Sequence, residues 1–150
     1  MRYFYLIISI LVITTAVHAE EVYPAACKPF VIHGESVKFP AGTPRVVMLH
    51  NLSQFDVWIT HSIELNSRLQ SNLWSALALD KHAFELSCIE SKPGHEQQVS
   101  CEETLAVCEW PITTRPKHTK GIVWAGENMP LSTLTAYISR RGFELPQTAQ

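Results

Sequence analysis

Four cysteines are the residues of this chain whose type and spacing most directly predict chemistry. Cys88 and Cys101 flank a polar segment centred on the Pro-Gly pair at 93–94, which favours a turn. Folding the chain at that turn brings the two cysteines opposite, or nearly opposite, each other on a β-hairpin, within disulfide reach. This pairing leaves Cys27 for Cys108. The rival connectivity, Cys101 with Cys108 and Cys27 with Cys88, stays open.

Metal binding is the second chemistry to consider, because six histidines follow residue 19: His33, His50, His61, His82, His95 and His118. None of them lies in an HExxH run. The segment around His50 resembles the first-ligand region of the cupredoxins, and a copper site would then use His50, His118 and Met129 with a free thiolate at Cys108. Those positions are widely spaced, and Cys108 is expected in a disulfide. A cupredoxin-like or other metal-binding β-sandwich is therefore the alternative, and we expect no cofactor.

Catalytic motifs are not found in the sequence. There is no GxSxG elbow, no SxxK and no glycine-rich phosphate loop. Glu102 and Glu103 are adjacent, so on a strand their carboxylates would point to opposite faces and could not act as an acid–base pair. Asp80 and His82 could belong to a triad only through a geometry that sequence does not specify. We expect that the protein is not an enzyme.

The aromatic residues indicate one candidate binding surface. Trp58 shares a predicted strand face with Asp56 and Thr60, which places an aromatic ring among polar side chains. Such a ring presents apolar area together with a polar handle. Trp58 and Asp56 are therefore the candidate partner-binding residues.

The N-terminus predicts export. Arg2 precedes an apolar run over residues 6–17, and small residues stand before residue 20, so residues 1–19 read as a signal peptide. The remaining 150 − 19 = 131 residues carry 14 acidic and 12 − 1 = 11 basic side chains. This balance of charges does not indicate a basic surface for binding nucleic acid or an anionic membrane. No later segment is long and apolar enough to span a bilayer. We expect a periplasmic or secreted protein with two disulfides.

Alternating apolar residues predict the strands that position these groups. In the cysteine hairpin, Phe84, Leu86 and Val99 share one face. A second hairpin is predicted over residues 45–61, with Met48 opposite Val57 on a core face. Residues 62–72 are polar and are predicted to form a loop or a short helical turn. Strands are also predicted at 73–79, at 105–110 and at 122–124, where Gly126 would stop the last one.

The C-terminal part predicts one helix over about residues 129–141. Asn128 is a suitable N-cap, and Leu134 and Ile138 fall on one face. Gly142 supplies the residue that commonly ends a helix in a Schellman motif. Residues 20–146 are thus predicted to be a single domain, an antiparallel β-sandwich with one C-terminal α-helix, followed by a tail at 147–150.

Three runs of the sequence are similar to one family: VVMLHNLSQFDVWITH, NLWSALALDKHAFELSCIESKPGHEQQVSC and WAGENMPLSTLTAYISRRGF. They resemble the enhanced-entry protein B (EnhB) family, small exported proteins of intracellular bacterial pathogens. The likeness covers most of the chain after residue 19, and it rests on general pattern, not on a catalytic motif. It implies an envelope protein that acts in host-cell entry or intracellular survival, with another envelope protein or a host-facing protein as its partner. It implies no enzymatic activity and no cofactor.

Overall fold

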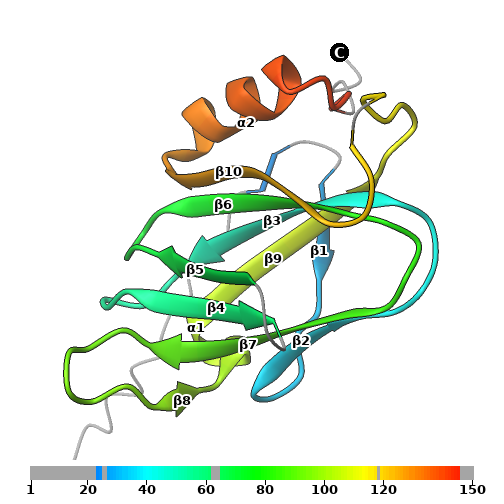
Figure 1. The fold of residues 1–150 in the computed structure, drawn as a ribbon. Helices are drawn as coiled ribbons and strands as arrows, with labels where there is room; N and C mark the ends of the chain where they lie inside the picture. Colours follow the sequence, from blue (N-terminus) through cyan, green and yellow to red (C-terminus); the bar gives the residue numbers. More distant parts are fainter. Residues whose placement is uncertain (1–22, 25–26, 62–64, 118, 146–150) are drawn as a thin grey trace, which may run out of the picture.

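The computed structural model describes residues 23–24, 27–61, 65–117 and 119–145, and these form two packed antiparallel sheets (Figure 1). The strands of sheet A, in spatial order, are β1 (Lys28–Phe30), β9 (Leu105–Pro111), β3 (Arg45–Asn51), β6 (Trp74–Leu79) and β10 (Val123–Met129). Those of sheet B are β2 (Ser36–Phe39), β7 (Phe84–Glu90), β4 (Val57–His61) and β5 (Leu65–Leu69), and β8 (Gln98–Val99) also pairs with β7. The predicted signal peptide and tail lie outside the described residues.

The main apolar core lies between the sheets, and a second core lies beneath the C-terminal helix. Val47 and Leu49 of β3 belong to the first core, together with Val57 and Ile59 of β4. The alternate residues of β3, such as Met48, belong to the second core under helix α2 (Leu131–Arg140). Sheet A is therefore covered on both faces.

The predicted 45–61 hairpin is wrong. β3 pairs with β6 and β9 in sheet A, whereas β4 pairs with β5 and β7 in sheet B. Met48 and Val57 therefore lie in different cores and do not face each other. Because β3 is apolar on both faces, its alternation did not identify which face meets β4.

Three further sequence predictions differ from the structure. Within 62–72, residues 65–69 form strand β5, which pairs with β4; residues 62–64 lie outside the described part. The last strand continues through Gly126 to Met129, because two register shifts against β6 accommodate it. Asn128 is not the helix N-cap, since Pro130 occupies that position. Asn128 has φ +47°, accepts a hydrogen bond from the Gln70 amide at 2.7 Å and donates to the Arg68 carbonyl at 2.8 Å.

The C-terminal helix itself is confirmed. Leu134 and Ile138 are fully buried against sheet A. Gly142 has φ +87°, and its amide donates to the Ser139 carbonyl at 2.9 Å, while the Phe143 amide reaches the Ile138 carbonyl at 3.4 Å. These two bonds form the predicted Schellman motif, and the buried Phe143 ring completes its apolar contact.

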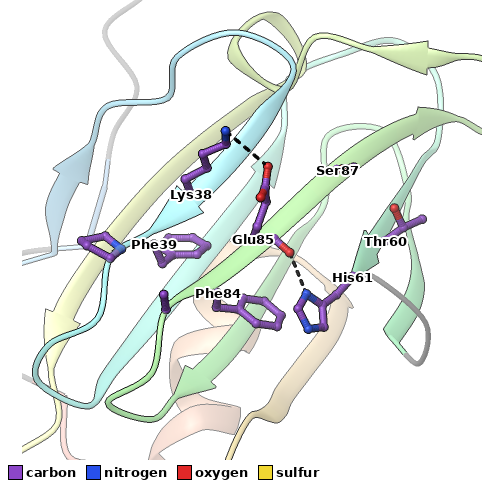
Figure 2. Close-up of a pocket in the computed structure, with 9 residues that line it drawn as sticks. Lys38, Phe39, Thr60, His61, Phe84, Glu85 and Ser87 are labelled. Atoms are coloured by element: carbon purple, nitrogen blue, oxygen red, sulfur yellow. Dashed lines mark hydrogen bonds and ion pairs between the residues drawn. The ribbon is translucent and has the colours of Figure 1, made fainter.

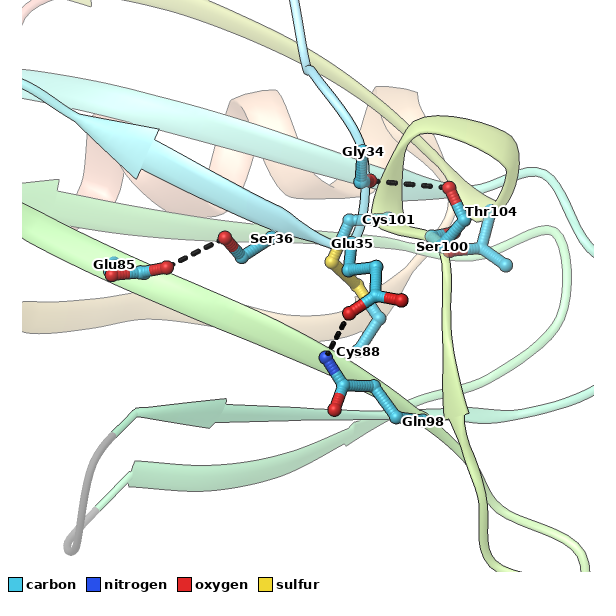
Figure 3. The surroundings of a disulfide bond; sticks show 9 residues. All are labelled: Gly34, Glu35, Ser36, Glu85, Cys88, Gln98, Ser100, Cys101 and Thr104. Carbon is cyan, nitrogen blue, oxygen red and sulfur yellow. Dashed lines mark hydrogen bonds between the residues drawn. A yellow bond between two sulfur atoms is a disulfide. The ribbon is translucent and has the colours of Figure 1, made fainter.

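Both predicted disulfides are confirmed, Cys27–Cys108 and Cys88–Cys101, each with a Cα–Cα distance of 5.5 Å. The hairpin register is different from the predicted one. Val99 lies opposite Cys88, and Cys101 begins the short helix α1 (Cys101–Thr104), which the sequence analysis did not predict. Figure 3 shows the bridge between β7 and α1, where Ser100 Oγ donates to the Gly34 carbonyl at 3.2 Å. Both sulfur-bearing residues are completely buried, so this bridge is structural.

A buried amide joins the two sheets where β3 ends. The Asn51 side chain is completely buried, and its Nδ2 donates to the carbonyls of Phe55 at 2.8 Å and Leu69 at 3.0 Å. Its Oδ1 accepts hydrogen bonds from the Ser53 amide at 3.0 Å and the Ser53 hydroxyl at 2.6 Å. Asn51 therefore satisfies the backbone of the turn into sheet B and of strand β5.

Candidate functional site

Trp58 lies on the outer face of sheet B, as the alternation in β4 predicts. The residues on either side of it in β4, Val57 and Ile59, are buried in the core, whereas Trp58 is partly exposed. Across the sheet it lies opposite Ile89 of β7 and Arg68 of β5. Ile89 is also partly exposed, so the two apolar side chains lie opposite each other on the two inner strands of this sheet.

Asp56, the second candidate, is committed to internal contacts. Its Oδ2 accepts hydrogen bonds from the Arg68 guanidinium, at 2.8 Å from Nε, and its Oδ1 accepts one from the Ser71 amide at 3.1 Å. Burial raises the pKa of Asp56, but the bonds from Arg68 and Ser71 outweigh it, so the pKa is lowered from its usual 3.8. Asp56 thus holds Arg68 beside Trp58 and organises the surface.

The lowered pKa of Asp56 predicts an acid-sensitive contribution to stability. A lowered folded-state pKa means that the contribution is present above the usual value of 3.8 and is lost as the pH falls through the lowered pKa. We expect Asp56→Asn to flatten the dependence of the unfolding free energy on pH between about 5 and about 2. Denaturant titrations at several pH values measure this. The Arg68→Gln variant should flatten the same interval, and an unchanged slope in both would contradict the assignment.

A hollow of about 800 Å³ lies farther along sheet B, at the start of β7 (Figure 2). Its lining comes from β2, β4 and β7 and the turns beside them: Lys38, Phe39, Pro40, Thr60, His61, Ala83, Phe84, Glu85 and Ser87. Lys38 Nζ lies 3.7 Å from Glu85 Oε1, which also accepts the Ser36 hydroxyl at 2.6 Å. The His61 ring packs on Phe84 with centroids 4.0 Å apart.

The hydrogen bond of His61, which lines the hollow, shows which of its ring nitrogens is the donor. His61 Nδ1 lies 2.8 Å from the Glu85 carbonyl oxygen, which can only accept, so Nδ1 carries the hydrogen. The other ring nitrogen, Nε2, is then an acceptor in the neutral imidazole. Sequence reasoning missed this hollow because its residues come from three separate strands. The only signal was the alternation of polar residues on the outer faces of those strands.

The structure does not assemble the metal set of the alternative interpretation. Cys108 is bonded to Cys27, so it offers no thiolate. His50 stacks on Trp74 with ring centroids 4.3 Å apart, and Met129 lies opposite Trp74 on the other side. Two strand spacings of about 4.8 Å therefore separate the backbones of His50 and Met129. His118 lies outside the described residues, and within the described part no three His, Cys, Asp or Glu side chains cluster as metal ligands.

Asp80 and His82 do form a hydrogen-bonded pair. Asp80 Oδ2 lies 2.9 Å from His82 Nδ1, and Asp80 Oδ1 accepts the His82 amide at 2.8 Å. These bonds from His82 lower the pKa of Asp80. The imidazole is 71% exposed, and all the contacts fall within three consecutive residues. The pair therefore closes the turn between β6 and β7.

Comparisons with known proteins add no relationship: no protein-family model, no curated protein and no solved structure matches the chain. Neither of the helices in the described residues is long and apolar enough to cross a membrane.

Proposed function

We propose that this protein is an exported, non-enzymatic domain that binds another protein through the outer face of sheet B. The observation that supports it most is the apolar pair Trp58 and Ile89, which lies partly exposed among polar side chains. Interfaces commonly use an aromatic anchor surrounded by polar groups that exclude water. The hollow beside Lys38 and His61 extends the same face.

The two sheets differ in how their outer faces are used, and this contrast supports the proposal. On sheet A the outward residues of β3, β6 and β9 are buried beneath α2 and the N-terminal segment, including Val46, Met48 and Trp110, and only His50 among them is partly exposed. On sheet B the outward residues of β2, β4, β5 and β7 all keep some exposure, and none of the described elements covers them. A second molecule could therefore pack there without displacing any described part of the chain.

Two disulfides are compatible with a protein outside the cytoplasm, where such bonds persist. The resemblance to the EnhB family adds the rest of the proposal. It gives a role in host-cell entry or intracellular survival, with another envelope protein or a host-facing protein as the partner. No cofactor is part of this role.

Trp58→Ala is expected to weaken partner binding about 30-fold, as for an interface hot spot worth roughly 2 kcal/mol. The protein after residue 19 would be used to purify crosslinked partners from envelope extracts, and the affinity for the recovered partner would then be measured for each variant. Ile89→Ala should weaken binding in the same direction. Both variants should keep the wild-type unfolding free energy to within about 1 kcal/mol, because neither side chain is a core residue.

Val31→Ala is the matched control, since Val31 is an exposed apolar residue, 68% accessible, outside sheet B. It should bind the partner like the wild type. Equal losses for Val31→Ala and Trp58→Ala would show that the outer face of sheet B is not the interface. Turnover of a cell-wall or peptide substrate, with no specific partner recovered, would overturn the proposed function itself.

A further inference from the structure

The charges of the described residues are separated between the two ends of the sandwich. Six basic side chains gather at one end, on the turn after β6, the loop before β10 and the end of α2: Lys81, Arg115, Lys117, Lys120, Arg140 and Arg141. The described parts of the loop before β10, residues 112–117 and 119–121, lie beside the C-terminal end of α2, far from α1 and β8 (Figure 1). We call this surface the basic end.

Specific contacts hold the three segments of the basic end together. A methyl group placed on Gly142 would lie 3.2 Å from Pro116 Cγ, so the loop packs against the end of the helix. Thr113 Oγ1 donates to Glu144 Oε2 at 3.2 Å. The Gly42 amide donates to the Lys81 carbonyl at 2.9 Å, and the Ile112 amide donates to the Pro44 carbonyl at 2.8 Å, so residues 42–44 connect the turn after β6 to the loop before β10. The segments that carry the cations therefore lie at the same end of the sandwich.

Few acidic groups oppose these cations. Besides Glu109 and Glu85, which pair with Arg45 and Lys38, the acidic side chains described at the basic end are Asp80 and Glu144, which leaves an excess of 6 − 2 = 4 positive charges. Arg45, also at this end, is 8% exposed and paired with Glu109 at 3.0 Å. The opposite end carries five glutamates and one lysine: Glu35, Glu90, Glu96, Glu102, Glu103 and Lys92.

We infer that the basic end docks on an anionic lipid surface through the phosphate groups of the lipids. The basic end has no large apolar anchor among its described residues, since Ile112 and Ile122 pack into the two cores. A protein interface needs such an anchor at its centre, whereas a layer of headgroups attracts cations alone. The outer face of sheet B has such an apolar anchor in Trp58, so the two surfaces bind different partners.

The net negative charge of the whole protein does not prevent this docking. β7 runs from the basic end to the acidic end over seven residues, or about 20 Å at 3.3 Å per residue. The Debye length at physiological salt is about 8 Å. A membrane in contact with the basic end is therefore screened from the glutamates at the other end, and the charge separation orients the molecule.

The protein after residue 19 should cosediment with phosphatidylcholine vesicles that contain phosphatidylglycerol, but not with phosphatidylcholine alone. Each cation near an anionic surface strengthens partitioning about fivefold, so Lys117→Gln with Lys120→Gln should weaken it about 25-fold. The control pair, Arg68→Gln with Lys92→Gln, removes the same charge near the opposite end of β7 and should cause little loss. Raising the salt from about 0.1 M to about 1 M should release the wild-type protein.

Several results would overturn this inference. They are equal losses for the two variant pairs, equal binding to vesicles without phosphatidylglycerol, and retention at high salt. If the Lys117 and Lys120 pair reduces capture of an acidic protein while the wild type ignores anionic vesicles, the basic end recognises a protein and the inference is wrong. None of these results bears on Trp58, so the proposed function is tested separately.

Discussion

Replacing both Cys27 and Cys108 by alanine is expected to lower the free energy of unfolding by about 4.5 kcal/mol. The bridge closes a loop of 81 residues, and the entropy that it removes from the unfolded chain grows with the logarithm of loop length. It also ties the N-terminal segment to the second core, where both cysteines are buried. Denaturant unfolding of the oxidised protein and of the double variant measures the difference.

The second disulfide provides the comparison. Cys88 and Cys101 are only 13 residues apart, so the same relation gives about 3 kcal/mol for the corresponding double variant. The long-range bridge should therefore contribute roughly 1.5 kcal/mol more. A hairpin bridge that contributes as much as the long one would mean that native contacts around α1, and not loop entropy, dominate its effect.

Asn51→Ala is expected to lower the unfolding free energy by about 3 kcal/mol. The change leaves the Leu69 carbonyl without its amide donor, the Phe55 carbonyl with the Ser53 hydroxyl alone, and the Ser53 amide without its acceptor. Each unsatisfied buried group costs roughly 1–3 kcal/mol. The loss should appear as a shift of the denaturation midpoint with an unchanged slope.

Ser53→Ala is the control for Asn51, because it removes only the hydroxyl that donates to Asn51 Oδ1 and to the Phe55 carbonyl. It should cost about 1 kcal/mol. If Asn51→Ala costs no more than Ser53→Ala, the link between the sheets is not energetically important. Residues 51–53, Asn-Leu-Ser, match the acceptor pattern for N-glycosylation. Since both Nδ2 hydrogens of Asn51 are engaged in the folded state, this site should remain unglycosylated once the protein has folded.

The sequence predicted those parts of the fold that depend on local patterns. The alternation of Phe84, Leu86 and Cys88, the Schellman motif at Gly142 and the Cys88–Cys101 pair follow from turn chemistry and periodicity. The Cys27–Cys108 pair followed only by elimination. Which strands pair across the sandwich is a non-local property. β3 illustrates this, because its residues 46–49 are apolar and buried on both faces, so their alternation does not show which side meets which sheet.

The site was only partly predictable for the same reason. Trp58 could be assigned to an outer face from its own strand, but Ile89 reaches it only through the pairing of β4 with β7. The basic end could not be predicted from the sequence, because the net charge is a sum over the whole chain. Only the fold shows that the loop that carries Lys117 lies far from the glutamates of α1.

The side chain of Asn128 has a consequence for the outermost strand of sheet B. The amide accepts from Gln70 and donates to Arg68, which are the two backbone bonds that an adjoining strand would make with the end of β5. An edge with free backbone groups can recruit strands from other molecules and nucleate aggregates. Asn128 makes both of these bonds, so this part of the β5 edge offers fewer free backbone groups to a strand from another molecule.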